Sequence, residues 1–441
     1  MTSRFRLTVD LHVMALLLAG LACTTDASQQ GPPGSVPGFV EPREDARAGM
    51  ADQDGPTGAA PTVGASEPED ASSPPGGSSA GDTSGSGPGA EGGPSVSGPI
   101  ASGTGEMAGG SAGANTDPQE GGAPGAVEGT APLARGFFVD GRTLRDRCGE
   151  PVVLRGVNEM VIYTPSQDGL PAFSEIARSG ANSVRITWNT RGPVGKLDAA
   201  MSNAIANQLI PMVVLNEATG DLSRVGQEVD YWVRNDVVAT IKKYEDKALL
   251  NIANEAGDGS VTQAAFTSTY QDAIQRMRSA GIHTPLVIDG SQWGQNIDML
   301  QAVGPGLISF DPDHNLIFSV HMYWDDPSGA RVTAEIDQSV SMGLPLIVGE
   351  FAQHAVAGCG SAPFAYKTLL SLAQRSQIGF FPWSWGTVTN NDCRNDQPFD
   401  MTTDGTFAGL QGWGAEVAVT DPNSIQKTSV RSHYMLTSSC L

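Results

Sequence analysis

Basic residues are scarce in this chain of 441 residues, which has 26 Lys and Arg against 48 Asp and Glu and a formal net charge of −22. No stretch gathers enough positive charge to follow a phosphate backbone, so we expect no nucleic-acid partner. Beyond the N-terminus, no apolar run approaches the roughly 20 residues of a membrane-spanning helix. The acidic balance suits an exported protein that meets neutral ligands.

Patterns that bind metals or cofactors are also missing. The six histidines show no H-E-x-x-H or similar spacing, and none of the five cysteines forms a C-x-x-C pair. No G-x-G-x-x-G follows a strand-like run, so the usual dinucleotide site is absent as well. We therefore expect neither a catalytic metal nor a cofactor.

Residues 1–23 have the layout of an export signal. Arg4 and Arg6 precede an apolar stretch, and small residues lead to Cys23. The last six residues, LAGLAC, resemble a bacterial lipoprotein processing site, which would attach lipid to Cys23 and tether the protein to a membrane. Small residues at 20 and 22 also fit ordinary signal cleavage, so an extracellular and a lipid-anchored cell-surface protein both stay open.

Residues 24–134 consist mainly of Gly, Ser, Pro and Ala with scattered acidic residues. So little apolar surface cannot offset the entropy of ordering the chain, and we predict a disordered linker with a reach on the order of 55 Å. One domain of roughly 300 residues remains, residues 135–441, which we expect to be a monomer.

Four cysteines lie in this predicted domain. An even count in an oxidising compartment favours disulfide bonds, and four cysteines allow three pairings. Reduced cysteines are the less favoured alternative. We favour two pairs, Cys148 with Cys440 and Cys359 with Cys393.

From residue 135 on, residues 136–142 and 151–156 predict a hairpin, and short apolar runs then alternate with stretches of helical spacing. Three helical stretches end in glycine before the next run, at Gly180, Gly281 and Gly343. Eight buried parallel strands favour an α/β fold closed as a (β/α)8 TIM barrel over an open doubly wound sheet. The predicted strands are 152–156, 183–187, 211–215, 249–253, 286–289, 316–321, 345–349 and 379–383.

Functional groups follow six of these runs, at the edge where such a barrel builds its active site. Each alone is more often structural, but six strand ends in register predict one polar cup. They are Arg185, Asn216 and Glu217, Asn254 and Glu255, His321 and Tyr323, Glu350, and Trp383 and Trp385.

Two carboxylates, Glu255 and Glu350, directly follow strong apolar strands. Glycoside hydrolysis needs such a pair, because one acid protonates the leaving oxygen while the other carboxylate attacks or activates water. The charge of Glu350 is expected to keep Glu255 protonated. Arg185 and Tyr323 are expected to donate to Glu350, and Asn254 to the sugar 2-hydroxyl.

Aromatic residues complete the predicted cup. Trp383 is expected to lie under the sugar ring at the cleavage point, with Trp293 and Trp385 extending the cleft. Trp188 and Trp324 fit the cleft and the outer packing about equally well. Asp289 fits either a helix cap or a hydrogen-bond acceptor behind the site.

The ordered set of motifs resembles glycoside hydrolase family 5, and within it the bacterial endo-β-1,4-mannanases. The resemblance covers about 136–385 and implies a retaining mechanism with Glu255 as acid/base and Glu350 as nucleophile. It also implies supporting roles for Arg185, Asn254, His321, Tyr323 and Trp383; we place no clear counterpart in the family for the chain beyond Gly386. The motifs are VLRGVN (153–158), GANSVRI (180–186), EATG (217–220), NIANE (251–255), WG (293–294), FSVHMY (318–323), IVGEF (347–351) and WSW (383–385).

Two positions depart from this family pattern, which usually has histidine in place of Asn216 and tryptophan in place of Ala256. Both carboxylates are kept, so we predict an endo-acting hydrolase of β-1,4-mannan. A β-1,4-glucan is the alternative substrate, since the same catalytic set serves both. The alternative to an enzyme is a surface-displayed sugar-binding protein that has lost turnover. Binding alone, however, would not require both glutamates.

Overall fold

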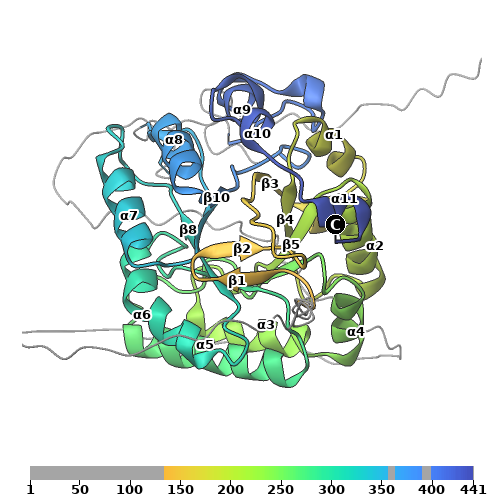
Figure 1. The fold of residues 1–441 in the computed structure, drawn as a ribbon, viewed down its shortest axis with the longest axis vertical. Coiled ribbons are helices and arrows are strands. Elements are labelled where there is room, and N and C mark those ends of the chain that lie inside the picture. The colour runs from red at the N-terminus through yellow and green to blue at the C-terminus, as the bar shows by residue number, and fades with distance from the viewer. Residues whose placement is uncertain (1–133, 356–362, 390–398, 441) are drawn as a thin grey trace, which may run out of the picture. The chain divides into compact units, whose positions relative to one another are not determined.

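The computed structural model describes residues 134–355, 363–389 and 399–440, which form an α/β barrel (Figure 1). The predicted signal segment with Cys23, and the linker up to residue 133, lie outside the described residues. Cys359 and Cys393 also lie outside them, so these sequence-based expectations stay predictions. Within the described ranges, no helix is long and apolar enough to cross a membrane.

Eight parallel strands pair with one another in chain order. The ring closes where Phe380 N donates to Leu154 O at 3.1 Å and Asn158 N donates to Pro382 O at 3.1 Å. The predicted (β/α)8 barrel is therefore confirmed, in place of the open sheet. The strands are β3 (Gly156–Glu159), β4 (Ser183–Trp188), β5 (Ile210–Leu215), β6 (Leu249–Asn251), β7 (Leu286–Asp289), β8 (Leu316–His321), β9 (Leu346–Glu350) and β10 (Gly379–Phe380).

Helices surround the strands on the outside of the barrel (Figure 1). Gly180, Gly281 and Gly343 follow three of them with φ of 84°, 80° and 69°, the left-handed conformation that was expected of them. The main helices are α1 (Ala172–Arg178), α2 (Val194–Ala206), α3 (Val225–Trp232), α4 (Asn235–Lys243), α5 (Gln263–Ser279), α6 (Ile297–Phe310), α7 (Ala330–Ser341) and α8 (Tyr366–Ser376). Shorter elements are η1 (Val161–Tyr163), η2 (Leu222–Arg224), η3 (Phe407–Gly409), α9 (Gly412–Ala415), η4 (Glu416–Thr420), α10 (Ile425–Thr428) and α11 (His433–Thr437).

Alternate residues of each strand serve different layers, because successive side chains point to opposite faces. Outward residues such as Val184 and Ile186 join the large core between strands and helices. Inward residues near the strand starts form a separate apolar cluster, which includes Ile210, Leu249, Val287, Ile317 and Ile347. Further along several strands the inward positions are buried and polar, namely Asn158, Arg185, Asn251, Asp289 and Ser319. This change from apolar to polar places the candidate site at the carboxyl ends of the strands.

A short antiparallel hairpin, β1 (Phe138–Asp140) and β2 (Thr143–Arg145), closes the opposite end of the barrel (Figure 1). Phe137 and Leu144 belong to the inner apolar cluster, so the hairpin seals the bottom of the barrel. The second strand of the hairpin is β2 rather than the predicted 151–156. Residues 152–155 instead lead into β3, which begins at Gly156.

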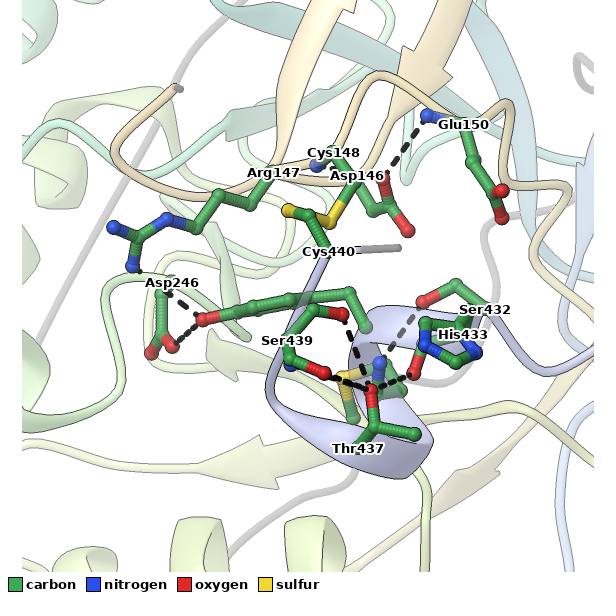
Figure 2. The surroundings of a disulfide bond; sticks show 12 residues. Asp146, Arg147, Cys148, Glu150, Asp246, Ser432, His433, Thr437, Ser439 and Cys440 are labelled. Carbon is green, nitrogen blue, oxygen red and sulfur yellow. Dashed lines mark hydrogen bonds between the residues drawn. A yellow bond between two sulfur atoms is a disulfide. The ribbon is translucent and has the colours of Figure 1, made fainter. Parts of the chain in front are cut away.

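A disulfide bond joins Cys148, just after the hairpin, to Cys440, the pairing that the sequence favoured (Figure 2). Cys148 N donates to Asp146 Oδ1 at 2.9 Å, and the Tyr434 hydroxyl donates to Asp246 close by. The two cysteines are 292 residues apart. The bond therefore ties the start of the barrel domain to the C-terminal segment.

Replacing Cys148 and Cys440 together by serine is expected to lower the free energy of unfolding by about 2–4 kcal/mol, because the crosslink restricts the unfolded chain. Chemical denaturation of the full chain and of the double variant measures the difference. Substitution is used rather than a reductant because Cys359 and Cys393 stay untouched. Equal unfolding midpoints for the two proteins would contradict the expectation.

Candidate active site

Arg185, on β4, is the centre of the polar layer inside the barrel. Its side chain is fully buried, and it uses all five N–H donors of a guanidinium group. Burial opposes its charge, yet the neighbouring Asp289 and Glu350 raise its pKa above the ordinary value. Its acceptors are Asn251 Oδ1 at 3.0 Å, Asn158 Oδ1 at 3.0 Å, Glu350 Oε1 at 2.7 Å, Asn254 Oδ1 at 2.7 Å and Asp289 Oδ2 at 3.1 Å.

Glu350, the last residue of β9, has a hydrogen-bond donor on each oxygen. Arg185 donates to Oε1, and the Tyr323 hydroxyl donates to Oε2 at 2.8 Å. Burial, followed by the charge of Glu350, raises the pKa of Tyr323 well above its usual range, so Tyr323 keeps the proton that it donates. The carboxylate of Glu350 is thereby held in one orientation.

Glu255 follows β6 in a left-handed conformation with φ of 47°, which is uncommon for a residue with a side chain. Its backbone N–H donates to Asp289 Oδ2 at 3.1 Å, and its carbonyl oxygen accepts from Gly220 N at 2.9 Å. Burial, followed by the charge of Glu350, raises the pKa of Glu255 to about 7. Glu255 is therefore partly protonated at neutral pH.

His321, at the end of β8, lies between the acidic groups. Its Nδ1 is 2.7 Å from Glu255 Oε1 and 3.5 Å from Glu350 Oε2, and its Nε2 is 3.4 Å from Asp289 Oδ2. Burial lowers the pKa of His321, but the charges of Glu350 and Asp289 outweigh it and raise the value to about 10. Gly294 makes room for the ring, since a Cβ at that position would lie 2.5 Å from His321 Cγ.

Asp289, on β7, is the acceptor behind the site rather than a helix cap. It binds Arg185 and the backbone of Glu255, and it faces His321. Burial alone would raise the pKa of Asp289, but the charges of His321 and Arg185 lower it. Asn158 and Asn251 were not predicted as site residues; their polar side chains at alternate positions of apolar strands were the available signal.

Four further residues from the sequence analysis lie half-buried near this centre. Asn254 donates from Nδ2 to Thr219 Oγ1 at 2.9 Å, and Asn216 donates from Nδ2 to the Tyr163 hydroxyl at 2.6 Å. Trp293 packs against the loop after β5, where a Cβ on Gly220 would lie 2.7 Å from its Nε1. Trp383 packs with one side against the core. All four stay predicted substrate contacts.

Trp385 is a correction to the sequence analysis, which expected it to extend the cleft. The side chain is fully buried, and its Nε1 donates to Gly405 O at 2.7 Å. The reason is that the loop at residues 402–405 lies over this indole, and Thr402 N also donates to Trp385 O at 3.1 Å. Trp188 and Trp324 are also buried, bound to the Tyr231 hydroxyl and to Gln295 O respectively.

Glu255, His321 and Glu350 also have the spacing of a three-ligand metal site in the described part of the chain, with one ligand atom of each within 4.8 Å of the others. The local charges disfavour such a role. Arg185 lies 2.7 Å from Glu350, and a histidine with a pKa of about 10 has no free ring nitrogen for a metal at neutral pH.

Comparisons with known proteins point to one family. The family model Cellulase (glycosyl hydrolase family 5) matches residues 146–388. The chain is 32% identical over 303 residues to a mannan endo-1,4-β-mannosidase of Salipaludibacillus agaradhaerens, covering 67% of this chain and 94% of that protein. It is 31% identical over 306 residues to a mannan endo-1,4-β-mannosidase of Cellvibrio japonicus (strain Ueda107), covering 67% and 68% respectively. The mannohexaose complex of Thermomonospora fusca β-mannanase is a similar solved structure, with a TM-score of 0.61 and 28% identity over 68% of this chain and 100% of that one.

The free energy of unfolding is expected to fall as pH rises from about 6.5, where an unfolded histidine loses its proton, to about 10, where folded His321 does. The stabilisation by His321 is complete below this interval and lost above it. His321→Gln can still hydrogen-bond to Glu255 but does not titrate. Denaturant titrations across the interval should give the variant a shallower slope, and equal slopes would contradict the charge placed on His321.

Proposed function

This chain belongs to glycosyl hydrolase family 5, and we propose that it is an endo-acting enzyme that hydrolyses β-1,4-mannosidic bonds in mannan-type polysaccharides by double displacement. As a member of this family it is a glycoside hydrolase. The finer assignment is supported by two relatives named mannan endo-1,4-β-mannosidase and by a similar β-mannanase structure that holds mannohexaose. The observation that carries the proposal is the close pair of Glu255 and Glu350.

The gap between these carboxylates supports double displacement. One side-chain oxygen of Glu255 lies within 4.8 Å of one of Glu350. Retaining enzymes hold their two carboxyl groups about 5–5.5 Å apart, whereas inverting enzymes separate them by about 6.5–9.5 Å to admit a water molecule. The short gap favours direct attack of Glu350 on the anomeric carbon.

The two carboxyl groups differ in their surroundings, and this difference supports the roles proposed for them. Glu350 accepts hydrogen bonds from Arg185 and Tyr323 on both oxygens, which orients it for attack. Glu255 has a pKa of about 7 and can protonate the leaving glycosidic oxygen. When Glu350 becomes an ester its charge is lost, which removes one cause of the raised pKa of Glu255. Glu255 can then accept a proton from the water that hydrolyses the ester.

The predicted sugar contacts lie around this pair. Asn254 is one residue from Glu255 and bound to Arg185, which suits a hydrogen bond to the 2-hydroxyl that strengthens in the transition state. Trp383 offers an indole face to the ring. Asn216 and Ala256, the two departures from the family pattern, change the surroundings of the same subsite. They bear on the choice between mannan and β-1,4-glucan rather than on the reaction.

Reducing-sugar release by the purified chain is expected from mannan and to be much smaller from soluble cellulose. Glu350→Ala should lower kcat by at least about a thousandfold, because it removes the nucleophile. Glu335→Gln is the matched control, since Glu335 is a glutamate of the outer helix α7 whose side-chain oxygen accepts from Gln301. Release from cellulose and not from mannan would identify β-1,4-glucan as the substrate. A folded protein that releases sugar from neither would favour a binding role.

The pH dependence of kcat/KM tests the role of Glu255 separately. The value should fall as pH rises through about 7, because deprotonated Glu255 cannot protonate the leaving oxygen. Glu255→Gln should lower kcat/KM on mannan by about 10²–10⁴ and abolish this limb of the profile. With aryl mannosides that have acidic leaving groups, Glu255→Gln should lower the rate of the glycosylation step much less. An unchanged limb in Glu255→Gln would assign the titration to another group.

A further inference from the structure

The C-terminal segment Phe399–Thr402 lies directly behind the candidate site, although the match to the family model ends at residue 388. The Phe399 ring meets the Tyr323 ring edge-on, with centroids 6.0 Å apart and planes at 82°. The His354 ring lies on it as well, with centroids 4.6 Å apart. Phe399 is 5% exposed, so both contacts are dry. Part of the catalytic centre thus packs against a segment beyond the residues that the family model matches.

The backbone of the same segment binds the chain that follows Trp383. Ser384 N donates to Phe399 O at 3.1 Å, and Met401 N donates to Ser384 O at 2.8 Å. The segment is thereby paired to both backbone groups of the residue next to the predicted sugar platform. It binds Ser384 on one side and packs against Tyr323 on the other.

Tyr323 needs such support because it lies beyond the end of β8, which stops at His321. Its hydroxyl is one of two donors that orient Glu350, and this hydroxyl lies at the far end of the side chain, where a small change in χ1 displaces it most. Reacting groups must be placed within a fraction of an ångström, and a shift of about 1 Å can cost roughly a hundredfold in rate. The ring contact with Phe399 restricts this motion.

We propose that Phe399 is a positioning residue for the reaction, acting through Tyr323 on the orientation of Glu350. The inference rests on the proposed function, because it requires Glu350 to be the nucleophile. Its ring restricts the Tyr323 ring, and its carbonyl oxygen, together with Met401 N, binds Ser384, the residue after Trp383. Phe399 itself touches neither Glu350 nor Glu255 through any of these contacts.

A double-mutant cycle between Phe399 and Tyr323 tests the proposal. Phe399→Ala should lower kcat on mannan by about tenfold to a hundredfold with KM changed by less than about threefold, because orientation of the nucleophile is lost and binding is not. In a Tyr323→Phe background, which already lacks the hydroxyl, the same substitution should cost less than about threefold. Equal losses in both backgrounds would overturn the proposal.

Two further variants separate positioning from stability. Phe399→Leu keeps most of the apolar volume without the aromatic ring. It replaces Phe399→Ala in the double-mutant cycle with Tyr323→Phe if Phe399→Ala does not fold. Phe407→Ala is the matched control. Phe407 is a half-buried phenylalanine of η3, and Arg178 Cζ lies 5.0 Å from its ring centroid. This variant should keep the wild-type kcat, and a loss equal to that of Phe399→Ala would contradict a specific role. A folded wild-type chain without turnover would reject the proposed function and this inference together, whereas an active wild type with an active Phe399→Ala rejects only the inference.

Discussion

The five hydrogen bonds of the buried Arg185 guanidinium are the interaction on which the rest of the site depends. A charged group without solvent must have its donors satisfied and its charge balanced. The surrounding strands meet that demand with two carboxylates and three amide oxygens from β3, β6, β7, β9 and the residue before Glu255. Removing one partner of such a buried pair typically costs about 3–5 kcal/mol, so the arrangement constrains five elements at once.

The same network makes the two glutamates of the site, Glu255 and Glu350, chemically different. Asp289 accepts from Arg185 and from the backbone of Glu255, and it also faces His321. Glu350 receives two donors, whereas Glu255 is buried beside the charge of Glu350 and has a pKa of about 7. The apolar lower half of the barrel supports this layer from below, and the β1–β2 hairpin closes it. Fold and chemistry are therefore linked through a few inward-facing positions.

Much of this could be predicted from the sequence, because a barrel brings the carboxyl ends of its strands together. His321 and Glu350 end strands, Arg185 lies within β4, and Glu255 and Tyr323 follow β6 and β8; the structure places these side chains in contact. The expectation for Trp385 was wrong because a later loop, at Gly405, covers its indole, and no local pattern around Trp385 shows that contact. To predict Asn158 and Asn251 as site residues, one would have to know which strand residues face the inside of the barrel. The contact of Phe399 with Tyr323 joins distant segments, which no local pattern predicts.

The stereochemistry of hydrolysis is the sharpest test of the proposed mechanism. In that mechanism, the network around Arg185 holds Glu350 and Glu255 so close together that Glu350 attacks the anomeric carbon directly. Proton NMR of a mannooligosaccharide during the first moments of hydrolysis, before mutarotation, shows which anomer is released. The account predicts that the β-anomer appears first, since two displacements retain the configuration of the β-linkage. Initial release of the α-anomer would mean that water attacks in a single step, which would contradict the roles given to Glu350 and to the network around Arg185.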